Sequence, residues 1–364
     1  MKEVTYVFSG GRKTKIEQDL IESKEFYYGV PYLLSEKYNV EVIEFTSSNN
    51  KFFKFIDLVM TRVFSLPFST SNIISIKNLR KVYNSKNIVL VNENTAFSVL
   101  PLILLTKLSK KINVSIFVMG LYSKNLRFSY IAPIHRLFIK LLIFFMDNVF
   151  ILGKGELEVA KSFHKNHSKL IFFPFSTDEK FWKGPKLELG NNSDLIFIGN
   201  DGNRDPNIIV ELSDYFTNLN FEVVSKLSEF NSPKENLNLN KGSWRTGELN
   251  DVDIKRIYKK ARLSLIPLKQ STQPSGQSVA LQSMAVGVPV VITKTNGFWD
   301  EDIFIDGHNI FFVNGFKKKD WIEKIKEIYS DINLLTKVSE NASQTIEQHY
   351  KLSIFNEKLS KYIL

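Results

Sequence analysis

The feature that most constrains the fold is an alternation of short apolar runs with segments of helical spacing, repeated along most of the chain. In the first half the runs lie at residues 4–8, 40–45, 87–91, 114–119, 148–152 and 170–173. In the second half they resume at residues 194–199, 221–225, 263–267, 288–293 and 309–313. Apolar runs separated by helices are typical of parallel strands buried on both faces. The pattern therefore predicts an α/β fold with two doubly wound, Rossmann-like parallel sheets.

The alternation is interrupted once, by the turn-rich and charged segment PFSTDEKFWKGP at residues 174–185. A chain of 364 residues also suits two domains, since a domain usually contains about 100–200 residues. We expect a first domain at residues 1–178, a second at 179–340 and a terminal helix at 341–364 that crosses back to the first. The two sheets would face a central cleft, with ligands beyond the carboxyl ends of their strands.

Composition excludes several classes of site. The chain has no cysteine, which excludes disulfides, thiolate metal sites and a cysteine nucleophile. No apolar run approaches the roughly 20 residues that a membrane-spanning helix needs, and the first residues lack the apolar core of a signal peptide. We therefore expect a cytoplasmic protein, either soluble or peripheral on the inner face of the cell membrane.

Charge is unevenly distributed. The formal net charge is +10, and residues 181–364 contribute none of it, because they contain 23 basic and 23 acidic side chains. Residues 51–150 contain 14 basic and 3 acidic side chains. A surplus confined to one domain predicts an anionic partner for that domain. The sequence contains no recognised nucleic-acid-binding module, so we expect no nucleic acid and favour an anionic membrane surface.

The segment KFFKFIDLVMTRVF, residues 51–64, has two interpretations. It mixes bulky apolar with basic residues, which is typical of helices that lie in the membrane interface. Amphipathic helices packed on a protein core are commoner, and we favour that interpretation from the sequence.

The segment STQPSGQSVALQSMAVGVPVV, residues 271–291, contains no acid, base or histidine. Its place between two strand-like runs makes residues 269–278 a strand-to-helix loop. The free amides at such a helix start attract phosphate without any charged side chain. Ser275 or Ser278 can cap the helix, and Gly276 permits close approach of a ligand to the backbone.

A second loop follows the strand-like run LIFIG, which ends at Gly199. In the sequence NDGNRD that follows, Arg204 can pair with a diphosphate in fork geometry. The alternative is a surface turn in which Arg204 pairs with Asp201 or Asp205. Two candidate phosphate loops on one sheet favour the first interpretation.

Four segments carry a resemblance to a known family. They are FPFSTDEKFW at residues 173–182, LIFIGNDGNRD at 195–205, GELNDVDIKRIYKKARLSLIPL at 247–268 and LQSMAVGVPVVITKTNGFWDEDIFIDGHNIFFV at 281–313. In these segments the chain resembles the GT-B glycosyltransferases, in particular the retaining enzymes of the family 4 type. The resemblance covers most of the chain and implies a nucleotide-sugar donor in the second domain and an acceptor in the first.

The resemblance also implies roles for individual residues. Gly199 and Arg204 would hold the diphosphate, residues 275–278 the phosphate and sugar, residues 244–247 the base, and Gln282 the ribose. The implied donor-binding residues are therefore Gly199, Arg204, Trp244, Thr246, Ser275, Gly276, Gln277, Ser278 and Gln282. Gly10 and Gly11 would form the acceptor-side loop.

The chain departs from the family at three places. Pro274 and Gln282 stand where the family commonly has two glutamates eight positions apart, so Gln277 or backbone groups must replace the sugar-binding carboxylate. Gln282 still offers a donor and an acceptor to the ribose hydroxyls. The segment VMGLY, residues 118–122, stands where the family often has a histidine.

The chemistry that the resemblance implies needs no cofactor. In retaining transfer the leaving phosphate takes the acceptor's proton, while amides and Arg204 stabilise the developing charge. Glu93, just after a strand-like run, is a candidate base or acceptor contact, with loop capping as the alternative. We expect no metal, because the DVD and DED sequences at residues 251–253 and 300–302 are typical of helix caps or exposed turns.

Taken together, the sequence predicts a metal-independent, retaining hexosyltransferase of polysaccharide or lipopolysaccharide biosynthesis. It would transfer a sugar from a nucleotide donor to a surface-glycan or lipid-linked acceptor at the cytoplasmic membrane face. A transferase with a soluble acceptor and a GT-B-like nucleotide-sugar epimerase are alternatives that need no membrane. A non-catalytic nucleotide-sugar-binding protein is the third alternative, because the motif glutamates are absent.

Overall fold

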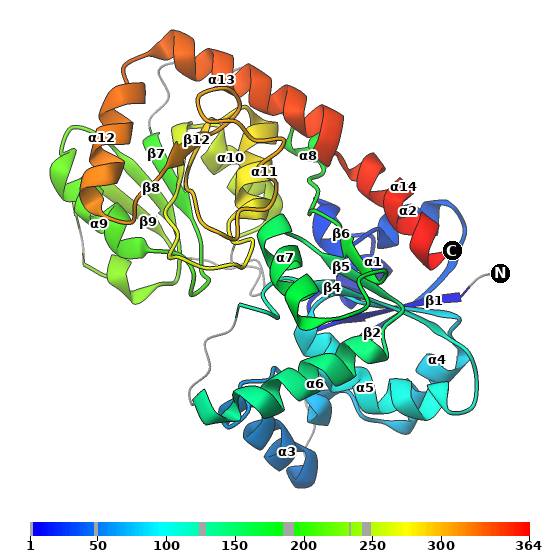
Figure 1. Cartoon of the computed structure of the whole chain (residues 1–364). Helices are drawn as coiled ribbons and strands as arrows, with labels where there is room; N and C mark the ends of the chain where they lie inside the picture. The colour runs from blue at the N-terminus through cyan, green and yellow to red at the C-terminus, as the bar shows by residue number, and fades with distance from the viewer. Residues whose placement is uncertain (1–2, 47–49, 124–128, 185–192, 233, 242–248) are drawn as a thin grey trace. The chain divides into compact units, whose positions relative to one another are not determined.

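The computed structural model describes residues 3–46, 50–123, 129–184, 193–232, 234–241 and 249–364 (Figure 1). The chain divides into two compact units, one of Met1–Pro174 with Asn356–Leu364 and one of Phe175–Phe355. The boundaries expected from the sequence, 178/179 and 340/341, both fall inside the second unit.

Hydrogen bonds donated by two backbone amides explain why the second unit begins before residue 179 and ends after residue 340. The Thr177 amide donates to the carbonyl oxygen of Tyr350 over 2.9 Å, and the Leu352 amide donates to Glu179 Oε2 over 3.0 Å. The segment before residue 179 is therefore fastened to the end of the helical region beyond residue 340.

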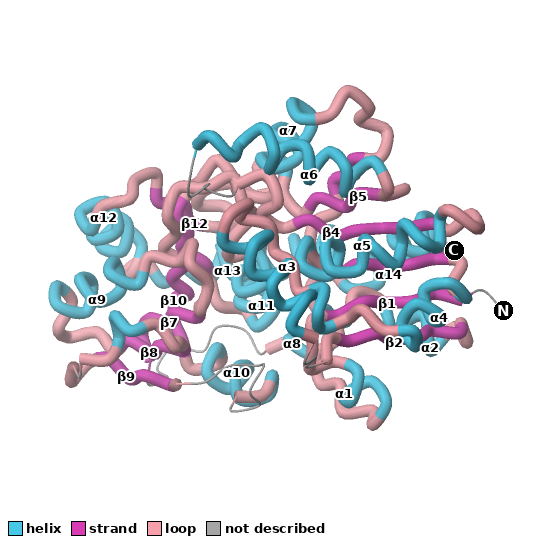
Figure 2. The backbone as a smooth tube through the Cα atoms, turned by 90° about the horizontal axis from the view of Figure 1, so that it is seen from below, coloured by secondary structure: helices cyan, strands magenta, loops and turns pink. Residues whose placement is uncertain are grey.

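Within the described ranges, the first unit has one sheet of six parallel strands in the order β2-β1-β3-β4-β5-β6. Each strand corresponds to one of the apolar runs predicted from the sequence. In Figure 2, β1 lies beside β2 and β4 beside β5, as their registers require. The strands are β1 Glu3–Phe8, β2 Asn39–Glu44, β3 Asn87–Leu90, β4 Asn113–Val118, β5 Asn148–Ile151 and β6 Leu170–Phe172.

Helices cover both faces of this sheet (Figure 1). On one face, α5 and α6 pack against alternate strand residues such as Ile116 and Val149. On the other face, the Tyr362 ring of α14 lies 5.4 Å from that of Phe150. The helices are α1 Lys13–Glu17, α2 Val30–Ser35, α3 Lys51–Arg62, α4 Ile76–Asn84, α5 Glu93–Lys107, α6 Ala132–Phe144 and α7 Lys154–Phe163, with α14 Leu352–Ile363 beginning in the second unit.

In its described part, the second unit also has one sheet of six parallel strands, in the order β12-β11-β10-β7-β8-β9. Helices α9, α12 and α13 bury their apolar residues against one face, around Trp321. The strands are β7 Ser193–Ile198, β8 Phe221–Val224, β9 Leu237–Asn240, β10 Ala261–Ile266, β11 Val290–Thr293 and β12 Phe311–Val313. The helices are α8 Glu179–Trp182, α9 Pro206–Tyr215, α10 Asp251–Tyr258, α11 Gln277–Val286, α12 Lys318–Ile328 and α13 Ile332–Thr345.

Strand β9 is the one described strand that the sequence did not predict. It lies at the edge of its sheet and has the sequence LNLN, so only every second residue is apolar. An edge strand has one neighbour instead of two, and it does not need the continuous apolar run of a central parallel strand.

Candidate functional site

The topology of the second sheet places a crevice beyond β7 and β10. Strand β7 lies between β8 and β10, so the chain leaves β7 toward one side and the loop after β10 leaves toward the other. Ligands of open α/β sheets bind at such a switch point, outside the carboxyl ends of the strands. We call residues 199–205 the β7 loop and residues 267–276 the β10 loop.

The two loops are tied to each other. The Asp205 amide donates to the carbonyl oxygen of Pro267 over 3.0 Å, and the Lys269 amide donates to that of Asn203 over 2.8 Å. The Asn203 side chain also donates to Ser275 Oγ over 2.8 Å. The structure therefore brings together the two loops that the sequence singled out as phosphate-binding candidates.

Arg204 points its guanidinium into the space between these loops and is 3% exposed. Its Nε and Nη1 atoms have no hydrogen-bond partner among the described residues. The nearest carboxylate oxygen, Asp201 Oδ2, forms an ion pair at 3.6 Å from Nε. Burial lowers the pKa of Arg204, and the charge of Asp201 raises it, but an arginine stays protonated in proteins.

The structure agrees in part with each interpretation of Arg204, the surface-turn pairing with Asp201 and the ligand site. The pairing with Asp201 exists, yet it is too long for a hydrogen bond, and the side chain is buried where a surface turn would expose it. Buried polar groups are normally hydrogen-bonded, and an exception needs an explanation such as a missing ligand. An anionic oxygen that accepted from Nε and Nη1 would supply one.

The guanidinium fits in its position because two neighbouring residues are glycines without side chains. A Cβ atom on Gly199 would lie 2.5 Å from Arg204 Nε, and one on Gly276 would lie 2.8 Å from Ile266 Cγ2 and 3.2 Å from Arg204 Nη1. Gly276 also has φ of +84°, in the left-handed region that favours glycine. Both positions therefore require glycine for the site to keep this shape.

Gly276 is the N-cap residue of α11, which corrects the expectation that Ser275 or Ser278 caps the helix. Ser275 Oγ instead accepts from Asn203, and a glycine has no side chain with which to cap. The first amides of α11 and the buried guanidinium beside Gly276 both carry positive charge. An anion bound between them would relieve this unfavourable arrangement.

The remaining donor-site candidates lie on α11 or outside the described residues. Gln277 and Gln282 are buried, whereas Ser278 is half-buried. Residues 278 and 282 are four apart, so they share one face of the helix. Trp244 and Thr246, the expected base-side residues, fall in residues 242–248, which the structure does not describe.

The first sheet has its own switch point, between β1 and β3. Gly10 and Gly11 follow β1 with φ of +146° and +77°, and a Cβ atom on either would meet no described atom within 4 Å. Arg12 is held beside them, because its Nε donates to the Phe26 carbonyl oxygen over 2.8 Å. The predicted acceptor-side loop is therefore open at the carboxyl edge of its sheet.

Glu93, the first residue of α5, is buried at the same edge. Its Oε1 accepts a hydrogen bond of 2.6 Å from the Met119 amide in the loop after β4. This contact fits the loop-capping alternative. A role for Glu93 as base or acceptor contact stays a prediction.

A second buried carboxyl, Glu156 of α7, holds the same loop and was not predicted. The Gly120 amide lies 2.8 Å from Oε1 and 2.9 Å from Oε2, and the Tyr122 amide donates to Oε1 over 3.2 Å. Burial, and secondly the charge of Glu93, raise the pKa of Glu156 to about 8. A glutamate in the first turn of a helix that follows a parallel strand was the available signal. The same signal marks many exposed helix starts.

Metal binding has no evident location in the part of the chain that is described. Within it, no three His, Asp or Glu side chains come close enough together to hold an ion. The DVD sequence at residues 251–253 begins α10, where Asn250 and Asp253 form a capping box.

Comparisons with known proteins agree with this arrangement. Residues 203–345 match the family model described as glycosyl transferases group 1, a segment that begins in the β7 loop and includes α11. No curated protein matches the sequence significantly.

Several solved structures share the fold. HepE from Anabaena, solved in complex with UDP and glucose, is 12% identical with a TM-score of 0.68, and the match covers 99% of each chain. Sucrose-phosphate synthase from Thermosynechococcus elongatus is 12% identical with a TM-score of 0.67 over 99% of this chain and 98% of that one. The lipopolysaccharide outer core galactosyltransferase WaaB is 12% identical with a TM-score of 0.63 over 100% and 99%.

The chain therefore has the two-domain GT-B fold of glycosyltransferases, as the resemblance implied. Within its second unit, residues 203–345 are similar to the glycosyl transferases group 1 family. The retaining mechanism and the family 4 type remain predictions.

Proposed function

We propose that the protein transfers a hexosyl group from a nucleotide-diphosphate sugar to a surface-glycan or lipid-linked acceptor at the cytoplasmic face of the cell membrane. The observation that carries the proposal is the buried guanidinium of Arg204 beside the N-terminus of α11. Its Nε and Nη1 atoms lack hydrogen-bond partners among the residues described, and they lie at the switch point where α/β sheets bind ligands. The glycosyl transferases group 1 match includes both Arg204 and α11.

In the proposed reaction, the bond between the anomeric carbon and the diphosphate oxygen breaks, and the acceptor hydroxyl oxygen bonds to the same carbon. Negative charge develops on the leaving diphosphate, where Arg204 and the first amides of α11 stabilise it. The acceptor's proton passes to a leaving phosphate oxygen. Retention and independence from metal are parts of this proposal, and the positive charge that the chain itself supplies supports the independence from metal.

The donor's other groups are assigned to the rest of the proposed site. Gln282 would bond the ribose, Gln277 and Ser278 the sugar and phosphate, and residues 244–247 the base. HepE has been solved with UDP-glucose, so uridine diphosphate sugars are the first donors to test here. The cytoplasmic membrane face is proposed from the basic surplus of residues 51–150.

The test is a thermal-shift panel of nucleoside diphosphates and their sugars on the wild type, Arg204→Ala and Arg256→Ala. Arg256 is an exposed arginine of the same unit, paired with Asp253 at 3.0 Å. One diphosphate should stabilise the wild type and Arg256→Ala equally, by about 2.7 kcal/mol at a hundred times its Kd, and Arg204→Ala much less. A flat panel with folded protein, or equal shifts in all three, would contradict the donor site.

The non-catalytic alternative is favoured by one observation, the replacement of both motif glutamates by Pro274 and Gln282. Once the panel has identified a donor, release of its nucleotide diphosphate in the presence of candidate acceptors separates the alternatives. Binding without release would support the non-catalytic protein, and a changed sugar still attached to its nucleotide would support the epimerase. Transfer to acceptors that lack a lipid would support the soluble-acceptor enzyme.

A further inference from the structure

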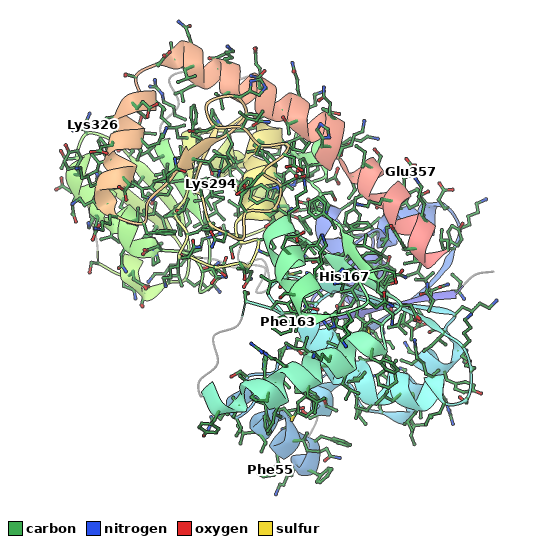
Figure 3. The ribbon with its side chains drawn as sticks, in the orientation of Figure 1. Phe55, Phe163, His167, Lys294, Lys326 and Glu357 are labelled. Atoms are coloured by element: carbon green, nitrogen blue, oxygen red, sulfur yellow. The ribbon has the colours of Figure 1, made fainter. Side chains whose placement is uncertain are left out.

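Helix α3 lies on the surface with one side half-buried and large apolar side chains exposed on the other, so the core-helix interpretation of residues 51–64 accounts for only one side of it. None of its 12 residues is buried, and Phe52, Phe55 and Leu58 are 67%, 64% and 44% exposed. Figure 3 shows Phe55 projecting outward from α3. The helix meets the core only toward its end, through the partly buried Met60 and, just beyond it, Phe64.

Helix α6 has apolar residues on two opposite faces. Its inner face is the ordinary one, with Ile139, Leu142 and Ile143 buried in the core. Its outer face carries a second stripe at positions 134, 137, 141 and 144, which are Ile, Leu, Leu and Phe, exposed by 43%, 64%, 41% and 72%. Spacing by three and four residues keeps these side chains on one side of the helix. A surface helix of a soluble domain usually has polar residues there.

The two helices form one surface. His135 Nδ1 of α6 lies 2.8 Å from the carbonyl oxygen of Phe64, which follows α3. The rings of Phe64 and Phe138 are 5.9 Å apart, and α3 lies next to α6 in Figure 1. We call the exposed side chains of both helices the α3–α6 surface. Exposed apolar side chains gathered on neighbouring helices are typical of an interaction site.

The charge of the α3–α6 surface is entirely positive. Five basic residues are exposed on it, which are Lys51, Lys54, Arg62, Arg136 and Lys140. The single acidic residue of the two helices, Asp57, is engaged inward, since its carboxylate oxygens accept from the amides of Thr70 and Ser71 over 2.7 and 2.9 Å. The exposed charged side chains of the two helices are therefore all basic.

We propose that the α3–α6 surface docks on an anionic lipid bilayer. Aromatic and aliphatic side chains would enter the boundary between head groups and acyl chains, and the five cations would contact lipid phosphates. Docking on one leaflet is the geometry that fits, because none of the helices in the described ranges has the length and apolar character of a membrane crossing.

A second copy of the chain is a poorer occupant of the same surface. A two-fold interface places identical patches against each other, so five cations would meet five cations, and like charges across an interface are costly. An anionic leaflet complements these cations and accepts the apolar side chains between them. The proposal deepens the proposed function, because it names the surface through which a membrane-face transferase would reach a lipid-linked acceptor.

The test of charge is flotation of the full-length protein with vesicles of phosphatidylcholine, alone or mixed equally with phosphatidylglycerol. We expect binding to the mixed vesicles only, with affinity falling as salt is added. The triple variant Lys51→Gln, Lys54→Gln, Lys140→Gln should bind about a hundredfold more weakly, since each basic residue near an anionic surface contributes about 1 kcal/mol. The matched control is Lys259→Gln, Lys260→Gln, Lys337→Gln, which removes the same charge from exposed positions of the second unit and should bind like the wild type.

The test of the apolar part uses the double variant Phe55→Gln, Leu137→Gln. Both side chains are exposed, so the melting temperature should not change, while vesicle binding should fall at least tenfold. The control pair Ile305→Gln, Phe316→Gln alters two exposed apolar residues of the second unit and should have no effect.

Three results would overturn the proposal. These are equal binding to neutral and mixed vesicles, equal losses in the variants and their controls, or no binding at low salt. A dimer that the α3–α6 variants abolish would assign the surface to a second copy. None of these measurements uses a nucleotide, so a negative result would not affect the proposed donor site. Conversely, if no nucleotide shifted the melting temperature, the vesicle-binding proposal would still hold.

Discussion

The carboxyl edges of the two sheets share a topology and differ in charge. In each, a switch point lies beside the first strand of the unit, and glycines begin the loop that follows. The edge of the second sheet is positive, with the Arg204 guanidinium next to the start of α11. The edge of the first sheet holds two buried carboxyls, Glu93 and Glu156, which accept from backbone amides. The comparison teaches that a doubly wound sheet supplies only the position of a site, and that side chains set its charge.

The contrast between the two sheet edges would fail most clearly if Arg204 served only to stabilise the fold and bound no ligand. With a donor identified, Arg204→Met should lower kcat/KM for release of the nucleotide diphosphate by roughly 10²–10³, as for loss of one charge-stabilising donor group. Its melting temperature should equal or exceed that of the wild type, because a buried guanidinium with unpaired donors is costly. Steady-state kinetics and calorimetry measure the two effects.

Arg256→Met is the matched control for that variant, and it should leave both the rate and the melting temperature near their wild-type values. If Arg204→Met unfolded at a clearly lower temperature, the guanidinium would be holding the loops together, and the positive edge would not be a ligand site.

The buried carboxyls at the edge of the first sheet can be tested through pH. The pKa of Glu156 is raised from 4.5 to about 8, so the folded state keeps a proton that the unfolded state releases. The wild type therefore loses stability as the pH rises from 4.5 to about 8, and Glu156→Gln should not. We expect the variant to match the wild type at about pH 5 and to exceed it by roughly 2–4 kcal/mol at about pH 9.

Denaturant unfolding at several pH values checks this expectation. Glu158→Gln is the control, because Glu158 lies on the same helix, is exposed and pairs with Lys161. Parallel stability curves for the wild type and Glu156→Gln would show that the buried carboxyl does not titrate as its surroundings indicate.

A substitution that reduces the space around the guanidinium should have a smaller effect on stability and nucleotide binding. Gly276→Ala should lower the free energy of unfolding by about 1–2 kcal/mol, since alanine is strained at the left-handed φ of this position, and should also weaken nucleotide binding. Gly202→Ala, in the same region but with no described atom near its Cβ position, should change neither. Equal effects of the two substitutions on nucleotide affinity would argue against close packing at Gly276.

The tie between the two loops is expected to matter least. Asn203→Ala removes the hydrogen bond to Ser275 Oγ, and a typical hydrogen bond of this kind contributes about 0.5–1.5 kcal/mol. Nucleotide affinity measured by titration calorimetry should fall up to about tenfold. Unchanged affinity would mean that the backbone hydrogen bonds alone hold the loops in place.

Most of the fold could be predicted because central parallel strands are continuously apolar. The apolar runs at β5 and β11 are easily recognised in the sequence, whereas β9 alternates Leu with Asn at a sheet edge and is not. Helix α3 shows another limit of pattern reading. Its periodicity predicts an apolar face correctly, but periodicity is the same whether that face meets a core or remains exposed.

The candidate site was predictable where chain geometry requires particular residues. Gly199 and Gly276 were found because turns and helix starts select glycine, and Arg204 because it stands in a loop between a strand and a helix. Glu156 was not predicted because its raised pKa depends on burial, and the sequence does not show whether an acidic residue at a helix start is buried. The serine cap was predicted wrongly because hydroxyl preference at helix starts does not reveal a competing partner such as Asn203.

The close fit of Gly199, Arg204 and Gly276 also restricts how this sequence can evolve. A Cβ atom at Gly199 would lie 2.5–2.9 Å from three atoms of the Arg204 side chain, so this glycine cannot be replaced while Arg204 stays where it is. Loss of Arg204 would release the constraint on Gly199, whereas Gly276 would still be required by its φ of +84° and by Ile266 Cγ2, which lies 2.8 Å from its Cβ position. A lineage that abandoned the anion should therefore be recognisable by the joint loss of Arg204 and Gly199, with Gly276 retained.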